Sequence, residues 1–538
     1  MNPPAPSYES GTSTQPLLGE TIGHALARVA AEHPGADALV DVPSGRRWTY
    51  AELDAAVSRL AAGLMAAGIG IGDGVAIWAP NYPEWVLLQF ATARMGALLV
   101  TVNPAYRTHE LEYCLKHSGA RLLVAVPAFK TSDYRAMVAE VRGNCPALEA
   151  VHWIGDAAWD ALAAGTEPGP ELAQRESELG FDDPINIQYT SGTTGFPKGV
   201  TLTHHNILNN GHFLGEVLGY TPADRVCVPV PFYHCFGMVI GNLGALTHGV
   251  AVVIPAPSFD PGATLAAVAA ERCTSLLGVP TMFIAMLNHP SLPELDVTSL
   301  RTGMMAGAPC PVEVMKRVVA ELGMDEVTIG YGMTETSPVS TQTRADDDLE
   351  RRVSTVGRVH PHVEIAVVDP ETGLTVPRGT RGEFRARGYH VMRGYWGEPG
   401  KTAEAVDAGG WMRSGDLAVM DAEGYVQIVG RIKDLVIRGG ENIAPRELEE
   451  FLYGHPEIVD AQVVGVPDPR FGEELCAAVR LTEGATATPE DIREYCRGRI
   501  AHFKVPRYVV VVTEYPMTVT GKIQKFLLRE QMVAQLEL

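Results

Sequence analysis

The sequence predicts an α/β protein in which parallel-rich βαβ sheets precede a small β-barrel-like part and a smaller α+β domain. Its 538 residues exceed what one compact core accommodates, so at least two domains are expected. Strand-like and helical segments alternate through the first three-fifths of the chain, which favours parallel sheets. After about Arg352, short strand-like segments separated by Gly and Pro indicate antiparallel β structure.

The alternation begins with an apolar run at Val75–Ala79, a helical segment at Glu84–Arg94 and a second apolar run at Ala97–Val102. Short apolar runs of this kind fit strands that are buried on both faces. The pattern continues through the following segments: Leu111–His117, Leu122–Val126, Ile185–Tyr189, Asn206–Leu218, Val226–Val230, Val250–Ile254, Thr274–Gly278, Met304–Ala306, Val312–Leu322 and Val327–Tyr331. The first three-fifths of the chain therefore predict one continuous series of βαβ units.

The antiparallel part is expected at Val363–Val368, Gly382–Ala386 and Tyr425–Val429. At Gly430 a last unit of about a hundred residues opens, which gives a large domain at residues 20–430. The last unit contains a helix from Pro445, strands near Ile458–Val466 and Leu475–Leu481, and a helix from Pro489. Residues 1–19 are rich in Pro, Ser and Thr and are expected to form a loose arm.

The composition is that of an ordinary globular protein, with 46% hydrophobic and 20% charged residues. The formal net charge of −21 argues against nucleic acid and anionic membrane surfaces as partners. The eight cysteines form no C-x-x-C pair, so reduced thiols in a cytoplasmic protein are expected. Residues 226–259 carry no charge, but Pro, Gly and His interrupt them, which predicts a buried core with a pocket and no transmembrane segment.

A loop rich in hydroxyl groups and glycine follows the strand-like Ile185–Tyr189. It reads Thr190-Ser191-Gly192-Thr193-Thr194-Gly195-Phe196-Pro197-Lys198-Gly199-Val200. Glycines let backbone N–H groups approach a ligand, while hydroxyls and an ammonium donate to a polyphosphate. Because Gly199 follows Lys198, the spacing is not that of the Walker motif. An ordinary solvated loop is the alternative.

A second motif follows the predicted strand Val327–Tyr331. It reads Gly330-Tyr331-Gly332-Met333-Thr334-Glu335-Thr336. Ligands of open α/β sheets bind where strands end, so Tyr331 can cover a nucleobase and Thr334 can donate to a phosphate. Glu335 offers the hard oxygen that Mg²⁺ prefers. A strand-end turn with an exposed glutamate is the alternative.

Both motifs resemble those of the acyl-adenylate-forming enzymes, which include acyl-CoA synthetases, luciferases and peptide-synthetase adenylation domains, and the resemblance covers nearly the whole chain. It implies that the first loop binds ATP, with Thr194 among the catalytic groups. It further implies that Tyr331, Gly332, Met333 and Thr334 bind the nucleotide and that Glu335 binds Mg²⁺. The segment Gly307-Ala308-Pro309 corresponds to the part of the family that lies against adenine, although a plain turn is almost as compatible with its residues.

The resemblance also assigns residues near the carboxyl end. Asp416 lies at the family's ribose position, where a carboxylate accepts from both hydroxyls, although the residues alone also suit a turn. Arg431 offers a fork of donors for a hydroxyl or phosphate. Residues 431–434 are the implied hinge of a mobile lid domain at 435–538, with Lys433 as the pivot.

Three further sites follow from the resemblance. Lys522, placed by sequence in the first turn of a helix capped by Thr520, matches the lysine that neutralises the carboxylate and α-phosphate. A surface lysine is the alternative. Gly439, Gly440 and Glu441 match the loop that lines the pantetheine tunnel for coenzyme A. His234 lies in Pro231–Gly237, the segment beside the acyl carboxylate, and a histidine satisfied within the core is its alternative.

Together these residues predict ATP-dependent activation of a carboxylic acid to acyl-AMP, release of pyrophosphate and transfer of the acyl group to coenzyme A. The overall pattern is most similar to the medium-chain fatty-acyl-CoA synthetase branch. Small apolar residues in 237–244 favour an aliphatic, medium- to long-chain acid. An aryl-acid CoA ligase, an enzyme that loads a separate carrier protein, and a non-catalytic acyl-nucleotide binding protein are the alternatives. A homodimer is compatible with this prediction.

Overall fold

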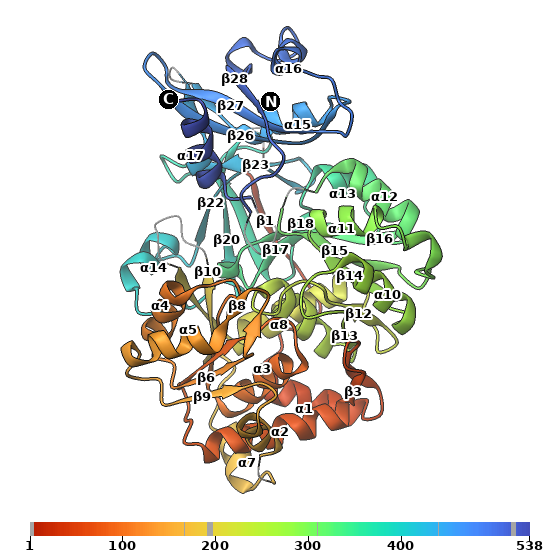
Figure 1. Ribbon diagram of the computed structural model, residues 1–538, viewed down its shortest axis with the longest axis vertical. Coiled ribbons are helices and arrows are strands. Elements are labelled where there is room, and N and C mark those ends of the chain that lie inside the picture. Colours follow the sequence, from red (N-terminus) through yellow and green to blue (C-terminus); the bar gives the residue numbers. More distant parts are fainter. Residues whose placement is uncertain (1–4, 166, 191–196, 309, 439–440, 518–522) are drawn as a thin grey trace. The chain divides into compact units, whose positions relative to one another are not determined.

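The computed structural model describes residues 5–165, 167–190, 197–308, 310–438, 441–517 and 523–538 and has a mixed α/β fold (Figure 1). The chain divides into two compact units. Unit 1 comprises Met1–Tyr8, Ala366–Arg385 and Arg413–Leu538, and unit 2 comprises Glu9–Ile365 and Ala386–Met412. The units differ from the predicted domains because residues 366–385 and 413–430 group with the carboxyl-terminal part. The hinge at 431–434 stays a prediction.

A seven-stranded sheet of unit 2 contains the first predicted strands. In spatial order its strands are β21 (Gly394–Tyr395), β11 (Lys198–Thr203), β10 (Pro184–Thr190), β5 (Leu98–Thr101), β4 (Gly74–Trp78), β6 (Leu122–Ala125) and β9 (Ala150–Trp153). The five strands from β10 to β9 are parallel, whereas β11 and β21 pair antiparallel. The predicted parallel βαβ units are thus confirmed in this sheet.

A nine-stranded sheet of unit 2 contains the other predicted strands. In spatial order they are β18 (Arg358–Val359), β17 (Val339–Gln342), β16 (Glu326–Gly332), β15 (Thr302–Ala306), β14 (Ser275–Gly278), β12 (Arg225–Cys227), β13 (Ala251–Ile254), β2 (Asp37–Asp41) and β3 (Arg46–Thr49). From β16 to β2 all neighbours are parallel, so the carboxyl ends of six strands meet at one edge. A small hairpin of β7 (Ala128–Phe129) and β8 (Ser132–Asp133) is separate.

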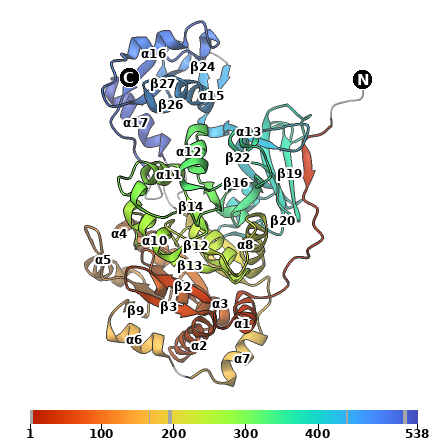
Figure 2. The ribbon, with the colours of Figure 1, turned by 90° about the vertical axis from the view of Figure 1, so that its right-hand side faces the viewer.

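Helices alternate with the strands of unit 2 along the chain. They are α1 (Ile22–Glu32), α2 (Tyr50–Ala66), α3 (Pro83–Met95), α4 (Thr108–Ser118), α5 (Tyr134–Val141), α6 (Ala157–Ala164), α7 (Pro170–Ser177), α8 (His204–Val217), α9 (Gly244–Leu246), α10 (Pro261–Glu271), α11 (Pro280–Leu287), α12 (Val312–Leu322), α13 (Leu349–Ser354) and α14 (Pro399–Ala405). Helices α1, α2 and α3 pack on one another, as Figure 2 shows. Every residue of α3 is buried, which explains why apolar residues are not confined to one face of this helix.

Helix α8 begins directly after β11, the strand that carries Lys198. The Oγ1 atom of Thr203 accepts from the backbone N–H of Asn206 at 3.1 Å, and Asn206 Oδ1 accepts from the N–H of Thr203 at 2.9 Å. This reciprocal capping pair satisfies two of the donors that a helix start leaves unpaired. It therefore fixes where α8 begins relative to β11.

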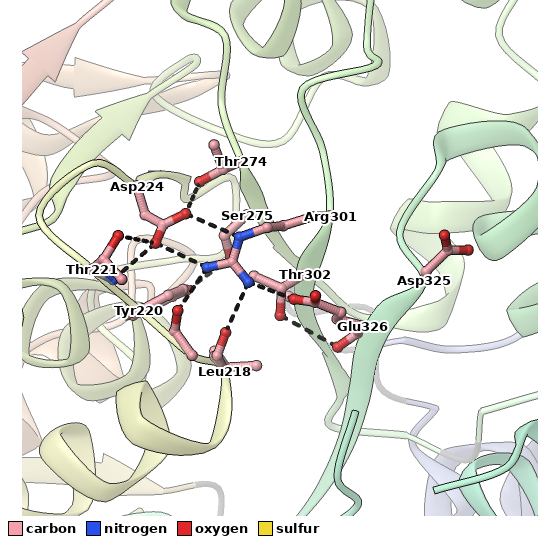
Figure 3. A network of polar contacts seen from close by, with 12 residues as sticks. Leu218, Tyr220, Thr221, Asp224, Thr274, Ser275, Arg301, Thr302, Asp325 and Glu326 are labelled. Carbon is pink, nitrogen blue, oxygen red and sulfur yellow. Dashed lines mark hydrogen bonds and ion pairs between the residues drawn. The ribbon is translucent and has the colours of Figure 1, made fainter. Parts of the chain in front are cut away.

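A network of charges joins the amino ends of four neighbouring strands in the nine-stranded sheet (Figure 3). Arg301, just before β15, donates from Nη2 and Nε to the two carboxylate oxygens of Asp224, at 2.9 and 3.2 Å. Asp224 precedes β12, is 5% exposed and accepts from Oγ1 of Thr274, just before β14, at 2.7 Å. Arg301 also pairs with Glu326, the first residue of β16. Burial alone would raise the pKa of Asp224, but the hydrogen bonds from Arg301 and Thr274 hold that pKa below 3.8.

Unit 1 consists mainly of the predicted antiparallel and carboxyl-terminal parts. The unit division passes through a five-stranded sheet of β1 (Tyr8–Ser10), β19 (Val363–Val368), β20 (Gly382–Gly388), β22 (Met412–Met420) and β23 (Val426–Arg431). The second sheet contains β25 (Glu441–Ile443), β24 (Val436–Arg438), β27 (Gly472–Leu481), β26 (Ile458–Asp468) and β28 (Tyr508–Val511). Its helices are α15 (Pro445–Tyr453), α16 (Pro489–Cys496) and α17 (Lys525–Gln535). Residues 8–10 of the expected loose arm thus form a strand.

Among the described residues, no helix has both the length and the apolar character that crossing a membrane requires. The uncharged stretch 226–259 is buried almost throughout and contains the end of β12, the whole of β13 and a π-helix, η2 (Phe236–Leu243). The prediction of a buried core there is confirmed.

Candidate active site

Strands β10 and β11 form an antiparallel hairpin, and the predicted phosphate-binding loop is the sequence between them. Thr190, the last residue of β10, lies opposite Lys198, the first residue of β11, in the antiparallel register. The predicted ligands between them, Ser191, Gly192, Thr193, Thr194 and Gly195, lie outside the described residues. The hairpin therefore places a hydroxyl and an ammonium at the two ends of this loop.

Tyr395 is a site residue that sequence reasoning does not identify. The Nζ atom of Lys198 lies 4.6 Å from the centroid of its ring, within the range of a cation–π contact. The hydroxyl of Tyr395 donates to Oε1 of Glu335 at 2.8 Å. Burial and the Glu335 carboxylate raise the pKa of this phenol, so it stays protonated and keeps donating. One side chain thus contacts both the predicted phosphate-binding lysine and the predicted metal-binding glutamate.

Sheet pairing explains how Tyr395 reaches both partners. Strand β21 pairs with β11, with Tyr395 opposite Val200. The backbone N–H of Met392 donates to the carbonyl of Glu335 at 2.9 Å, which holds the segment before β21 against the turn after β16. The sequence signal is a Gly-Tyr pair at 394–395, which is too common to identify a site.

The nucleotide motif begins in β16 and ends in a single 3₁₀ turn, η4 (Thr334–Thr336). Tyr331, Met333 and Glu335 are half-buried, Gly332 is exposed and Thr334 is buried. The motif therefore lies at the carboxyl end of a parallel strand, where ligands of open α/β sheets bind. The half-buried carboxylate of Glu335 is a hard oxygen donor, and such a group fits Mg²⁺ held by one carboxylate together with phosphates.

Strand β15 ends at the same edge of the sheet as β16, so the segment that follows β15 begins beside the nucleotide motif. Gly307 has a φ of +86°, a left-handed conformation that a residue with a side chain rarely adopts. Gly307 and Ala308 are both exposed, so a planar ligand can approach their backbone. Pro309 lies outside the described residues.

His234 is exposed, although Tyr233 and Cys235 on either side of it are buried. Exposure does not fit the alternative of a core histidine. Its neighbour Cys235 donates to Oε1 of Gln188 on β10. Burial, reinforced by the nearby Glu335 carboxylate, raises the pKa of the Cys235 thiol. The His234 segment therefore lies close to β10 and to the turn that carries Glu335.

The π-helix η2 follows this segment and contains the residues expected to line the acyl pocket. A side chain at Gly237 would lie 2.4 Å from the carbonyl oxygen of Pro231, and one at Gly241 would lie 2.9 Å from Val228. These glycines therefore allow tight packing against the chain after β12. They do not open a cavity themselves, so their small size is not evidence for the pocket. π-Helices are rare and occur frequently at functional sites.

In unit 1 the structure brings Asp416 and Arg431 into direct contact. They are opposite residues of the antiparallel strands β22 and β23, and Nε of Arg431 donates to Oδ1 of Asp416 at 2.8 Å. Asp416 is 4% exposed, whereas 46% of the Arg431 side chain is exposed. Asp416 thus lies in a strand and is buried, so the alternative of a turn residue is wrong. The pair presents a carboxylate oriented by a guanidinium.

The other predicted residues of unit 1 are placed less completely. Lys433 lies in a 3₁₀ turn, η5 (Ile432–Asp434), and Glu441 begins β25. Gly439, Gly440 and Lys522 lie outside the described residues. Helix α17 begins at Lys525 with Gln524 as its N-cap, so the prediction that Thr520 caps it is wrong. The Pro445 start is a better sequence signal, because proline suits the first turn of α15.

Comparisons with known proteins cover most of the chain and indicate one family. The model of the AMP-binding enzyme family matches residues 26–396, and that of the AMP-binding enzyme C-terminal domain matches residues 447–522. YngI of Bacillus subtilis (strain 168) is 48% identical over 97% of this chain and 99% of its own length. The medium-chain acyl-CoA ligase ACSF2, mitochondrial, of Danio rerio is 45% identical over 100% of this chain and 93% of its own. The crystal structure of ATP-bound MatB from Rhodopseudomonas palustris is 33% identical with a TM-score of 0.86, over 95% of this chain and 98% of that one.

Proposed function

The chain belongs to the AMP-binding enzyme family, and from this premise we propose that it is an AMP-forming acid–CoA ligase. One observation carries the proposal: Tyr395 contacts both Lys198 and Glu335 at the end of the phosphate-binding hairpin. This arrangement combines a cation with a hard carboxylate donor. An ATP site needs a cation for the phosphates and a carboxylate for Mg²⁺. A carboxylic acid has no good leaving group, so its activation needs ATP.

In the first half-reaction a carboxylate oxygen of the acid attacks the α-phosphorus of ATP. A new oxygen–phosphorus bond forms, the bond to the β-phosphate oxygen breaks, and pyrophosphate leaves. Lys198 and Thr190 bind phosphate oxygens of the leaving group at the mouth of the hairpin, and Tyr331 covers the adenine. The transition state spreads negative charge over phosphate oxygens, so positioning and positive charge carry catalysis.

Glu335 is the residue that would hold Mg²⁺, and when bound the ion supplies positive charge beside the phosphate oxygens. Tyr395 orients this carboxylate through its 2.8 Å hydrogen bond. Asp416 accepts from the ribose hydroxyls, and the guanidinium of Arg431 keeps its carboxylate oriented.

In the second half-reaction the thiol of coenzyme A attacks the acyl carbon, and AMP leaves. We assign Lys522 to the first half-reaction, Gly439, Gly440 and Glu441 to the path of coenzyme A, and Lys433 to the pivot that exchanges the two. The family resemblance supports these three assignments. His234 lies beside the acyl carboxylate in this scheme, and its exposure and the nearby Glu335 support that position.

The acid that we propose is a medium-chain fatty acid. The name of the 45%-identical relative and the fully buried apolar residues of the π-helix η2 support this choice. We also propose a cytoplasmic location, which cell fractionation tests. We further propose a homodimer, which analytical ultracentrifugation tests.

Release of AMP, measured with and without coenzyme A over short-, medium- and long-chain and aryl acids, tests the proposed reaction. We expect AMP release to require coenzyme A and to be fastest with medium-chain acids. AMP formation that requires an added carrier protein instead of coenzyme A would contradict it.

The Lys522→Ala variant is expected to lose acid-dependent exchange between ATP and pyrophosphate, and exchange at the wild-type rate would remove Lys522 from the mechanism.

A further inference from the structure

Three potential metal ligands that do not belong to the nucleotide motifs converge in unit 2. His212 and Glu216 are one turn apart on helix α8, and His248 lies in the turn that follows α9. One ligand atom of each residue lies within 4.8 Å of the others. None of these residues has a role in the proposed acid–CoA ligase reaction.

Two glycines of α8 allow this approach. A side chain at Gly215 would lie 2.5 Å from the ring of His248, and one at Gly211 would lie 2.9 Å from the backbone N of Gly244. Glycine is unfavourable inside a helix, and here it provides the close contact that seats His248 over α8. The cluster is therefore built into the packing of α8 against the segment around α9.

The hydrogen bonds of His248 orient it as metal-bound histidines are oriented. Its Nδ1 atom lies 3.0 Å from Oγ1 of Thr247 and 3.2 Å from the carbonyl oxygen of Gly244. The Thr247 hydroxyl donates to the carbonyl of Leu243 at 3.1 Å, and the Gly244 carbonyl can only accept, so Nδ1 carries the proton in both contacts. Nε2 then faces Oε1 of Glu216 at 3.1 Å. A lone pair facing a carboxylate requires a cation or a proton between them. Backbone carbonyls commonly hold the second nitrogen of a metal-bound histidine in this way.

The other two residues complete the arrangement. His212 has a buried Nδ1 atom with no hydrogen-bond partner, and its ring stacks on that of His248 with centroids 5.2 Å apart. The second carboxylate oxygen of Glu216 accepts from Nε2 of Gln15 at 2.9 Å, which orients the carboxylate. Gln15 and Glu216 also line an open groove of about 770 Å³, which gives an ion a path from solvent.

We propose that His212, Glu216 and His248 form a binding site for a divalent transition-metal ion such as Zn²⁺. Two imidazoles with one carboxylate suit Zn²⁺ and Co²⁺, whereas Mg²⁺ prefers oxygen ligands and water. Bonds of about 2.0–2.2 Å in a tetrahedron separate the ligand atoms by roughly 3.3 Å. The separation of 3.1 Å between Nε2 and Oε1 is already close to this value. The ion would fasten α8 to the turn after α9.

Calorimetric titration of the untagged, full-length, chelator-treated protein with Zn²⁺ tests the proposal. We expect one ion per chain and no competition from Mg²⁺. The His212→Ala and His248→Ala variants are expected to bind Zn²⁺ at least about 100-fold more weakly, and Gln15→Ala about 10-fold more weakly. His205→Ala removes another histidine of α8 and serves as the matched control with unchanged binding. Co²⁺ is expected to give the visible spectrum of nitrogen and oxygen ligands, without a sulfur charge-transfer band.

The wild-type titration decides the matter even if a variant fails to fold. Failure of the wild-type protein to bind Zn²⁺, or wild-type affinity in folded His248→Ala, would leave only an imidazolium–carboxylate pair and overturn the proposal. The Glu335→Gln variant separates this site from the proposed function. It is expected to keep full Zn²⁺ affinity, and loss of that affinity would place the ion at the nucleotide site instead.

Discussion

The parallel strands β12, β14, β15 and β16 begin at one edge of their sheet and end at the other, and the charged residues at the two edges are paired differently. At the amino ends, Arg301 binds both carboxylate oxygens of Asp224 and also pairs with Glu326 (Figure 3). At the carboxyl end of β16, Glu335 accepts from a neutral phenol, that of Tyr395. At the first end one guanidinium pairs with two carboxylates of the chain. At the second end a carboxylate is oriented while its charge remains available to a ligand.

This difference separates stability from function within one sheet. The amino-end network joins strands that are neighbours only in the folded state, so its loss is expected to weaken the fold. The carboxyl end is where an open α/β sheet binds its ligand, so changes there are expected to affect catalysis and leave stability nearly unchanged. The following substitutions test this separation, beginning with the largest expected effect.

The Glu335→Gln substitution removes the charge at the carboxyl end and keeps the shape of the side chain. We expect the rate of acid-dependent ATP–pyrophosphate exchange to fall about 100- to 1,000-fold, because one group that stabilises developing charge is lost. The midpoint of urea unfolding is expected to stay near that of the wild type. A rate within a factor of two of wild type would contradict the assignment of Glu335.

The Asp224→Asn substitution makes the equivalent change at the amino end. We expect the free energy of unfolding to fall by about 2 kcal/mol, because Arg301 loses its buried partner. The loss is smaller than for a fully buried pair because one-third of the Arg301 side chain is exposed. Exchange activity per folded molecule is expected to stay at the wild-type level.

A matched control for this network is Glu326→Gln, since 44% of the Glu326 side chain is exposed. We expect it to lower the free energy of unfolding by less than about 1 kcal/mol. An equal loss of stability in the Glu326 and Asp224 variants would show that burial does not determine the strength of this network.

The Tyr395→Phe substitution tests whether the hydroxyl at the carboxyl end matters. It removes the hydrogen bond to Glu335 and keeps the ring beside Lys198. We expect exchange to slow about 10-fold and the Mg²⁺ concentration for half-maximal rate to rise, because an orienting partner of a metal-binding residue is lost. A slower rate with an unchanged Mg²⁺ dependence would mean that Tyr395 acts through Lys198 only.

Sequence periodicity predicts the strands and helices of unit 2 well, because βαβ units repeat a local pattern. The positions of the phosphate-loop ends and of the motif from Tyr331 to Glu335 at strand ends are also predictable, since each motif directly follows a strand in sequence. Tyr395 is not predictable, because it reaches Lys198 only through the pairing of β21 with β11. The same holds for Arg301 and Asp224, which are 77 positions apart and meet because β12 and β15 both flank β14.

Glycines show a second limit of sequence reasoning. Gly237 and Gly241 have the composition of a pocket wall, but neighbouring atoms fill the space that their side chains would occupy. From the sequence alone, Gly215 and Gly211 are expected only to weaken helix α8. In the structure they allow His248 to approach α8. A missing side chain leaves room for a ligand or for another part of the chain, and only the packing distinguishes these two cases.

The smallest expected effect is the pH dependence of the amino-end network. The pKa of Asp224 in the folded state lies below its ordinary value of 3.8, so its contribution to stability is complete well above that pH. That contribution is lost as the pH falls through the folded pKa, because protonation removes the partner of Arg301. The difference in free energy of unfolding between wild type and Asp224→Asn is therefore expected to be constant from pH 7 to 5. It is expected to shrink by a few tenths of a kcal/mol near pH 4, where protonation of the unfolded state begins. Urea unfolding of both proteins at these pH values measures it, and a difference that grows on acidification would mean that burial outweighs the hydrogen bonds from Arg301 and Thr274.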